Sequence, residues 1–208
     1  MLRLVALRFR SSMMCPAGVL VMKSLLLPRT LFTILCFNSA YVCSSDFDDW
    51  QSERRTITAI TGRSITLDTP LKYLHWGSIW SAPNGDSVDE RGEVGLISRR
   101  VKIHGDITDG ETYINGTAGT WWGGHVFITK GVVQVSGAEL FHMGQAGFLA
   151  RYPIHFHAAQ DMTGSAVRKS SFHDTFQRCL VIHWTHNVEA SDNVAFNATA
   201  HCYFFEDA

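Results

Sequence analysis

Three heptapeptides near the end of the chain repeat one pattern: RYPIHFH at 151–157, QRCLVIH at 177–183 and AHCYFFE at 200–206. The second begins 26 residues after the first, and the third begins 23 residues after the second. In all three the fourth and sixth residues are apolar, and segments with Asn, Ser and Asp lie between them. A repeat of about 22 to 26 residues with such corners predicts successive coils of a three-faced parallel β-helix.

Upstream of these repeats, the chain from residue 55 onward consists of short alternating segments bounded by turn residues. TITAI (56–60) and SITLD (64–68) flank a Thr-Gly turn, and similar segments follow as far as His142. No stretch of the body has a sustained apolar stripe with the 3.6-residue period of a helix. The sequence therefore predicts an all-β chain.

Side chains on a strand point alternately to its two faces, so the repeat also predicts which residues line the interior. The uniformly apolar positions are expected to face inward: Ile154, Phe156, Leu180, Ile182, Tyr203 and Phe205. The alternate positions are expected to face outward: His155, His157, Val181, His183, Phe204 and Glu206. Because two of the outward residues are large and apolar, we expect something to pack over part of this face.

The outward face collects histidine and acidic side chains, which allows several roles. Imidazole and carboxylate ligands of the zinc type predict a divalent-metal site formed by His155, His157, His183 and Glu206. Acid or base chemistry on a polymer along this face would use the candidate catalytic residues Asp174, Arg178, His183 and Glu206. The alternative is a structural ladder whose stacked polar side chains bond neighbouring rungs.

The two cysteines of the body occupy equivalent positions in successive repeats. Stacked residues on adjacent rungs lie about 4.8 Å apart, so Cys179 and Cys202 are expected to be neighbours. A disulfide in an oxidising compartment and two free thiols that fill core space are both compatible with this placement.

The first 45 residues differ from the rest of the chain. They hold five of the 18 basic residues and no acidic residue, with a short apolar run at 31–37. This composition predicts a signal peptide or leader at 1–45, with an uncleaved signal-anchor or a mitochondrial leader as alternatives, and a β-helix domain at 46–208. The N-glycosylation sequons at Asn115 and Asn197 favour secretion.

The charge of the body argues against a nucleic-acid partner. Without the five bases of the leader, 13 bases face 19 acids, and phosphate binding needs a basic surface. An anionic polysaccharide remains compatible, held by a local basic patch or through a cation. A membrane contact would come only from an uncleaved leader or from segments outside this chain.

Several longer motifs occur in an order typical of one family: LKYLHWG (71–77), DERGEVGL (89–96), GHV (124–126), EL (139–140), MGQ (143–145), RYPIHFH (151–157), RC (178–179) and HCYFFED (201–207). The chain resembles the family of the cell migration-inducing and hyaluronan-binding protein, cell surface hyaluronidase and fibrocystin-L. The resemblance implies a right-handed parallel β-helix, a secreted or cell-surface location, calcium dependence, and hyaluronan binding or depolymerisation.

The resemblance also predicts what the chain lacks. The family's eight-glycine domain does not precede the repeats, and the last motif ends at the C-terminus, so we expect a solenoid truncated at both ends. Three hypotheses follow: an extracellular enzyme that cleaves a uronate polymer such as hyaluronan, a non-catalytic adhesive or receptor-like ectodomain, and an inactive fragment of a larger protein.

Overall fold

The computed structural model describes residues 19–21, 31–35, 51–75, 77–89, 91–105 and 121–207, with only the backbone described for the first two ranges. The sequon at Asn115 and most of the predicted leader lie outside these residues. The chain divides into two compact units, and the boundary in the sequence lies between Ser98 and Arg99.

The N-terminal unit is built on an antiparallel five-stranded sheet with the order β1-β4-β3-β2-β7. Its strands are β1 (Val19–Val21), β4 (Ser64–Leu67), β3 (Glu53–Thr61), β2 (Leu31–Leu35) and β7 (Glu93–Leu96). The predicted Thr-Gly turn joins β3 to β4, where Gly62 has a φ of 60°. Ile57, Ile65 and Val94 are buried between these strands.

Two strands of this sheet, β1 and β2, come from the stretch predicted as a leader. A separate antiparallel hairpin follows the sheet strands β3 and β4 in sequence, and is formed by β5 (Ile79–Ser81) and β6 (Ser87–Asp89). The assignment of 1–45 as a leader and 46–208 as a domain stays a prediction.

A buried carboxylate holds the segment 71–75 in this unit. Glu53 accepts hydrogen bonds from the backbone amides of Lys72 and Tyr73 and from Nε2 of His75, and it pairs with Arg55. Burial acts to raise the pKa of Glu53, but these hydrogen bonds and the charge of Arg55 outweigh it and hold the pKa below its usual value. The motif LKYLHWG therefore has a structural role here.

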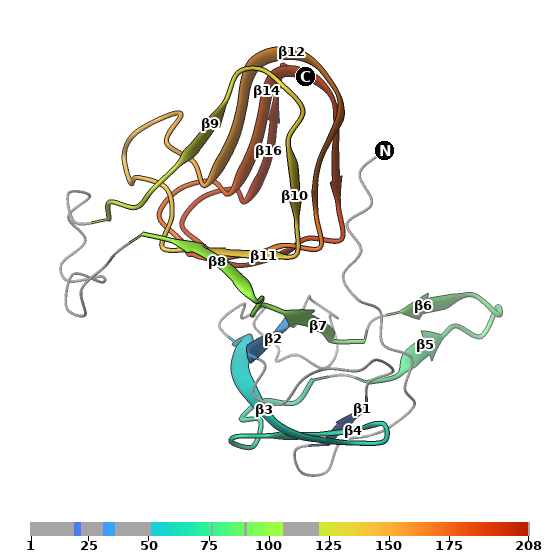
Figure 1. Ribbon diagram of the computed structural model, residues 1–208. Coiled ribbons are helices and arrows are strands. Elements are labelled where there is room, and N and C mark those ends of the chain that lie inside the picture. Colours follow the sequence, from blue (N-terminus) through green and yellow to red (C-terminus); the bar gives the residue numbers. More distant parts are fainter. Residues whose placement is uncertain are drawn as a thin grey trace. The chain divides into compact units, whose positions relative to one another are not determined.

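The C-terminal unit consists of strands that pair in parallel (Figure 1). They are β8 (Val101–His104), β9 (Val126–Ile128), β10 (Gln134–Ser136), β11 (Ala138–Phe141), β12 (Ile154–Arg168), β13 (Ser171–Thr175), β14 (Leu180–Ser191), β15 (Val194–Ala198) and β16 (Tyr203–Glu206). The long strands β12 and β14 bend, so their two ends pair in different ladders. The first parts of β12 and β14 form one face of the coils and their last parts form a second. The ladder β8-β11-β13-β15 forms the third face.

The predicted register is confirmed. Ile154 lies opposite Leu180, which lies opposite Tyr203. In the next inward column, Phe156 lies opposite Ile182, which lies opposite Phe205. The four inward residues of the first two rungs are buried and pack with Leu140 and Phe172 from the third face. Phe205 departs from the expectation and is 44% exposed. Among the described residues β16 is the outermost strand of its ladder, so Phe205 is packed from one side only.

The corners of successive coils stack in columns with a left-handed backbone. His142, Asp174 and Asn197 form one such column, with φ between 49° and 51°. Asn and Asp tolerate this conformation, which explains the Asn and Asp corners of the repeat. Within the described residues, no helix has the length and apolar content that a membrane crossing needs.

Candidate functional site

The three predicted outward histidines converge on one face of the C-terminal unit. His155 and His157 alternate along β12, and the register of β12 with β14 places His183 directly opposite His157. One nitrogen of each imidazole lies within 4.8 Å of the other two. Adjacent parallel strands thus bring together side chains that are 26 residues apart in the sequence.

His155 lies at the base of this cluster and is only 2% exposed. The rings of Tyr152 and Phe127 pack on it edge to face, at 4.8 and 5.1 Å between centroids. Its Nδ1 bonds to the carbonyl oxygen of Ala150 at 3.2 Å, whereas its Nε2 is buried without a hydrogen-bond partner. Burial lowers the pKa of His155 to about 4, and the nearby charges of His157, His183 and Arg178 act in the same direction.

His157 and His183 are half-buried and face each other. Their Nδ1 atoms are 3.1 Å apart, so one of them donates a hydrogen bond to the other. Nε2 of His183 lies 3.9 Å from a carboxylate oxygen of Asp207. The pair is therefore the accessible part of the cluster above the buried His155.

Arg178 covers the face beside the histidines. Its guanidinium carbon lies 3.8 Å from the centre of the Phe204 ring, and Nη1 donates to the hydroxyl of Tyr152 at 3.1 Å. Tyr152 and Phe204 belong to the rungs on either side of Val181, so the Arg178 side chain crosses over Val181. This explains why Val181, an outward residue, is buried, and it identifies one of the groups expected to pack over this face.

Glu206 and Asp174 do not join the histidine cluster. Glu206 lies opposite His183 in the register, but its carboxylate is directed to Arg178, with 3.7 Å between Oε2 and Nη1. Asp174 belongs to β13 on another face, where its carboxylate bonds to His173 and Asn197 at 2.8 and 2.7 Å. The predicted grouping of Asp174 with His183 and Glu206 thus does not form in the structure.

Sequence reasoning missed the partners of Asp174. His173 is buried between Asp174 and Glu139, and its Nε2 lies 3.2 Å from Oε1 of Glu139. Glu139 also accepts the backbone N–H of Arg99 at 2.7 Å. His173 and Glu139 come from different coils and share no local motif, so only the pairing of β11 with β13 reveals this network.

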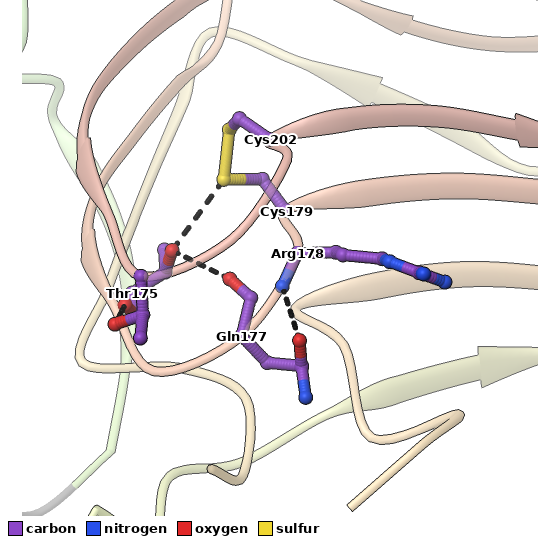
Figure 2. Close-up of a disulfide and its surroundings, with 6 residues drawn as sticks. Thr175, Gln177, Arg178, Cys179 and Cys202 are labelled. Atoms are coloured by element: carbon purple, nitrogen blue, oxygen red, sulfur yellow. Dashed lines mark hydrogen bonds between the residues drawn. A yellow bond between two sulfur atoms is a disulfide. The ribbon is translucent and has the colours of Figure 1, made fainter. Parts of the chain in front are cut away.

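Cys179 and Cys202 form a disulfide between adjacent rungs (Figure 2). The figure shows the Arg178 side chain directed away from the disulfide, and the Thr175 hydroxyl between the Cys179 sulfur and the backbone carbonyl oxygen of Gln177. Thr175 Oγ1 is 3.5 Å from the Cys179 sulfur. Of the two sequon asparagines, Asn197 is exposed at its corner, and it donates to Asp174.

Comparison with known proteins identifies the C-terminal unit. Residues 121–208 match the CEMIP β-helix family, and the match spans the three histidines, Arg178 and both cysteines. The predicted resemblance to the cell surface hyaluronidase family is thereby confirmed, and the parallel ladders of residues 126–206 are the strands of a CEMIP β-helix domain.

Longer alignments extend beyond the CEMIP β-helix match. Human cell surface hyaluronidase CEMIP2 is 32% identical over 181 residues, covering 80% of this chain and 13% of that protein. A G8 domain-containing protein of Dictyostelium discoideum is 38% identical over 162 residues (78% of this chain, 10% of that protein). Communication mutant protein F of the same organism is 35% identical over 159 residues (76% and 13%). The chain thus spans only about a tenth of the length of these relatives.

Proposed function

We propose that the CEMIP β-helix of this chain binds an anionic uronate polysaccharide of the hyaluronan type, outside the cell, on the face that carries His157, His183 and Arg178. The support is the juxtaposition of an accessible histidine pair and a partly exposed arginine on one parallel sheet. A human relative named as a cell surface hyaluronidase supports the polymer class and the location.

Arg178 carries the recognition of the polymer's negative charge in this proposal. The guanidinium of Arg178 donates one hydrogen bond, from Nη1 to Tyr152. Its Nε and Nη2 donors bond to none of the residues that the structure describes. Phe204 and Tyr152 hold the guanidinium in place, and a planar guanidinium matches the two oxygens of a carboxylate. A uronate carboxylate would bind at the edge of Arg178 that Glu206 leaves open.

Aromatic side chains beside the histidines would contact the apolar faces of sugar rings. Trp184 follows His183 at the corner of the coil, where it is 55% exposed and its ring lies 5.4 Å from that of His183. Its φ of 43° is the left-handed backbone that recurs at the coil corners, as at Ala158 one rung away, where φ is 48°. Phe127, also exposed, lies 5.0 Å from His157 on the other side.

Depolymerisation of the bound glycan is the second candidate function. The observation that favours it is the contact of His183 with both His157 and Asp207, which gives an accessible imidazole a neighbouring carboxylate. The candidate carboxylates Asp174 and Glu206 are engaged by other side chains. Binding without cleavage, as in an adhesive ectodomain, is therefore the better-supported reading.

The continuous stacking of parallel strands supports a finer proposal about the fold. We propose that the coils wind as a right-handed solenoid, because connections between parallel strands of one sheet are almost always right-handed.

Binding is tested with the full chain secreted from eukaryotic cells and fluorescent hyaluronan, measured by anisotropy. We expect wild-type protein to bind, and Arg178→Gln to weaken binding by about tenfold, the loss of one charge-assisted contact. Arg168→Gln is the matched control, because Arg168 is a partly exposed arginine at the end of β12, where it pairs with Glu189 and bonds to Gln134. Equal loss in both variants, or equal binding of uncharged dextran, would reject the proposal.

Cleavage is tested by size-exclusion chromatography of the same labelled polymer after incubation with the protein, with and without chelator. A shift to shorter chains that His183→Ala abolishes would establish the second candidate function. Unchanged polymer size together with binding would leave an adhesive ectodomain.

A further inference from the structure

The three converging histidines also carry an inference about the ion that this face would hold. We infer that His155, His157 and His183 form a three-histidine site for a zinc-type transition metal. Calcium is not the ion that this site binds. The inference rests on the proposed function for the role of the ion, whereas the ion's identity follows from the side chains themselves.

His155 is oriented as a metal ligand would be. A backbone carbonyl can only accept a hydrogen bond, so the Nδ1 atom that faces Ala150 carries the proton of the neutral ring. Nε2 then has a lone pair, and it is buried without a hydrogen-bond partner. Metal-binding histidines commonly donate their second nitrogen to a backbone carbonyl in this way. A structural ladder would instead supply a donor for this nitrogen.

His157 and His183 complete the set. Only one proton lies between their two Nδ1 atoms, which are 3.1 Å apart, so at least one lone pair points into the space between the rings. A bound cation would replace that proton, and the ring that held it would carry its proton on Nε2. The carboxylate of Asp207, 3.9 Å from Nε2 of His183, would favour a proton on that nitrogen by charge attraction.

The kind of atoms that would bind the ion distinguishes between zinc and calcium, the two ions that the sequence left open. Calcium takes about six to eight oxygen ligands, whereas the ligand atoms that converge here are three imidazole nitrogens. Glu206, the predicted fourth ligand, is directed to Arg178. Three histidines with a free fourth position are typical of zinc sites that bind water or substrate. The implied calcium therefore does not fit this cluster.

Metal binding to the untagged full chain tests the inference without any glycan. The protein is stripped with chelator, and Zn²⁺ is titrated by calorimetry, Co²⁺ by visible absorption and Ca²⁺ by competition. We expect one equivalent of Zn²⁺ or Co²⁺ per chain, with excess Ca²⁺ displacing neither. His157→Gln and His183→Ala should each weaken binding by at least about tenfold.

His186→Ala is the matched control, because His186 is an exposed histidine farther along β14 and outside the cluster. Far-ultraviolet circular dichroism confirms that each variant is folded. The inference is overturned if the folded wild-type protein takes up neither metal, if His186→Ala weakens binding as much as His157→Gln, or if Ca²⁺ displaces Co²⁺ one for one.

The two proposals fail separately. Protein that binds Zn²⁺ but leaves hyaluronan untouched would reject the proposed function and keep the metal site. Protein that binds hyaluronan equally well in chelator, and takes up no metal, would reject the metal site alone.

Discussion

Cys179 and Cys202 are joined by a disulfide that locks two adjacent rungs together, with their Cα atoms 4.4 Å apart. Cys179 immediately precedes β14, which carries His183, and Cys202 immediately precedes β16, which carries Glu206. The backbone N–H of Cys179 also donates to the carbonyl of Cys202 at 2.9 Å. The disulfide thus fixes the register of the two rungs beside the candidate site.

Replacement of both cysteines by serine should lower the free energy of unfolding by about 3 kcal/mol, because the disulfide restricts the unfolded chain across a separation of 23 residues. Urea denaturation of the double variant measures this loss. Reduced wild-type protein should match the double variant. An unchanged denaturation midpoint in both would show that the disulfide does not stabilise this unit.

Substitution of Gly123 by alanine should destabilise the C-terminal unit by more than about 2 kcal/mol, since a Cβ atom there would lie 2.1 Å from the carbonyl oxygen of His142. The adjacent Gly124→Ala is the control, because its Cβ would meet only the flexible side chain of Met143, at 3.3 Å. Thermal unfolding of both variants makes the comparison. Similar melting temperatures would contradict the close backbone approach at Gly123.

Glu53 should make the stability of the N-terminal unit depend on pH. Its pKa is lower in the folded than in the unfolded state, so its contribution is complete above the unfolded pKa and is lost as pH falls through the folded pKa. Melting temperatures between pH 7 and pH 3 should therefore fall more steeply for wild-type protein than for Glu53→Gln. At pH 7 that variant should be less stable by about 2 kcal/mol.

The control for Glu53 is Glu189→Gln, because the Glu189 side chain is 53% exposed. Its pH profile should follow that of wild-type protein. A Glu53→Gln profile parallel to wild type would show that the hydrogen bonds of Glu53 do not favour its charged form.

His155 should titrate far below an ordinary histidine. Its pKa is about 4 in the folded protein against 6.5 for the free side chain. The unfolded state therefore binds the proton first, and the stability that neutral His155 provides above pH 6.5 is lost as pH falls toward 4, by about 3 kcal/mol at most. NMR titration of the histidine ring protons in chelator should show a ring that is still unprotonated at pH 5.5 and whose signal is missing from the spectrum of His155→Leu.

A His155 resonance that titrates near pH 6.5 would contradict this prediction, because the ring would then be solvated. Assignment by His155→Leu is preferable to stability measurements alone, since the chain holds ten histidines and a stability curve does not say which of them is responsible.

Much of the fold was predictable because a coil repeats its chemistry. Inward apolar positions recur at the same place in each repeat, and parallel pairing of identical positions buries them together, as Ile154, Leu180 and Tyr203 show. The antiparallel sheet of the N-terminal unit was not predictable in this way. Its pairing of β2 with β3 and β7 joins segments that share no repeat.

The candidate site was likewise predictable only in part. Alternation along a strand determined that His155 and His157 share a face, and the repeat placed His183 above them. Which nitrogen is bonded, and that Glu206 contacts Arg178 instead of the histidines, depends on side-chain conformations that no spacing specifies.

The sequence by itself therefore determined the rungs of the C-terminal unit, their register and the residues on each face, because strand alternation and coil length are properties of the local chain. Only the tertiary structure decided what those faces do. Burial under Tyr152 and Phe127 keeps His155 neutral with a free Nε2, and the corner at Asp174 turns that carboxylate to His173 and Asn197 on another face. Such effects arise from neighbours in other coils, whose contacts form only when the coils stack.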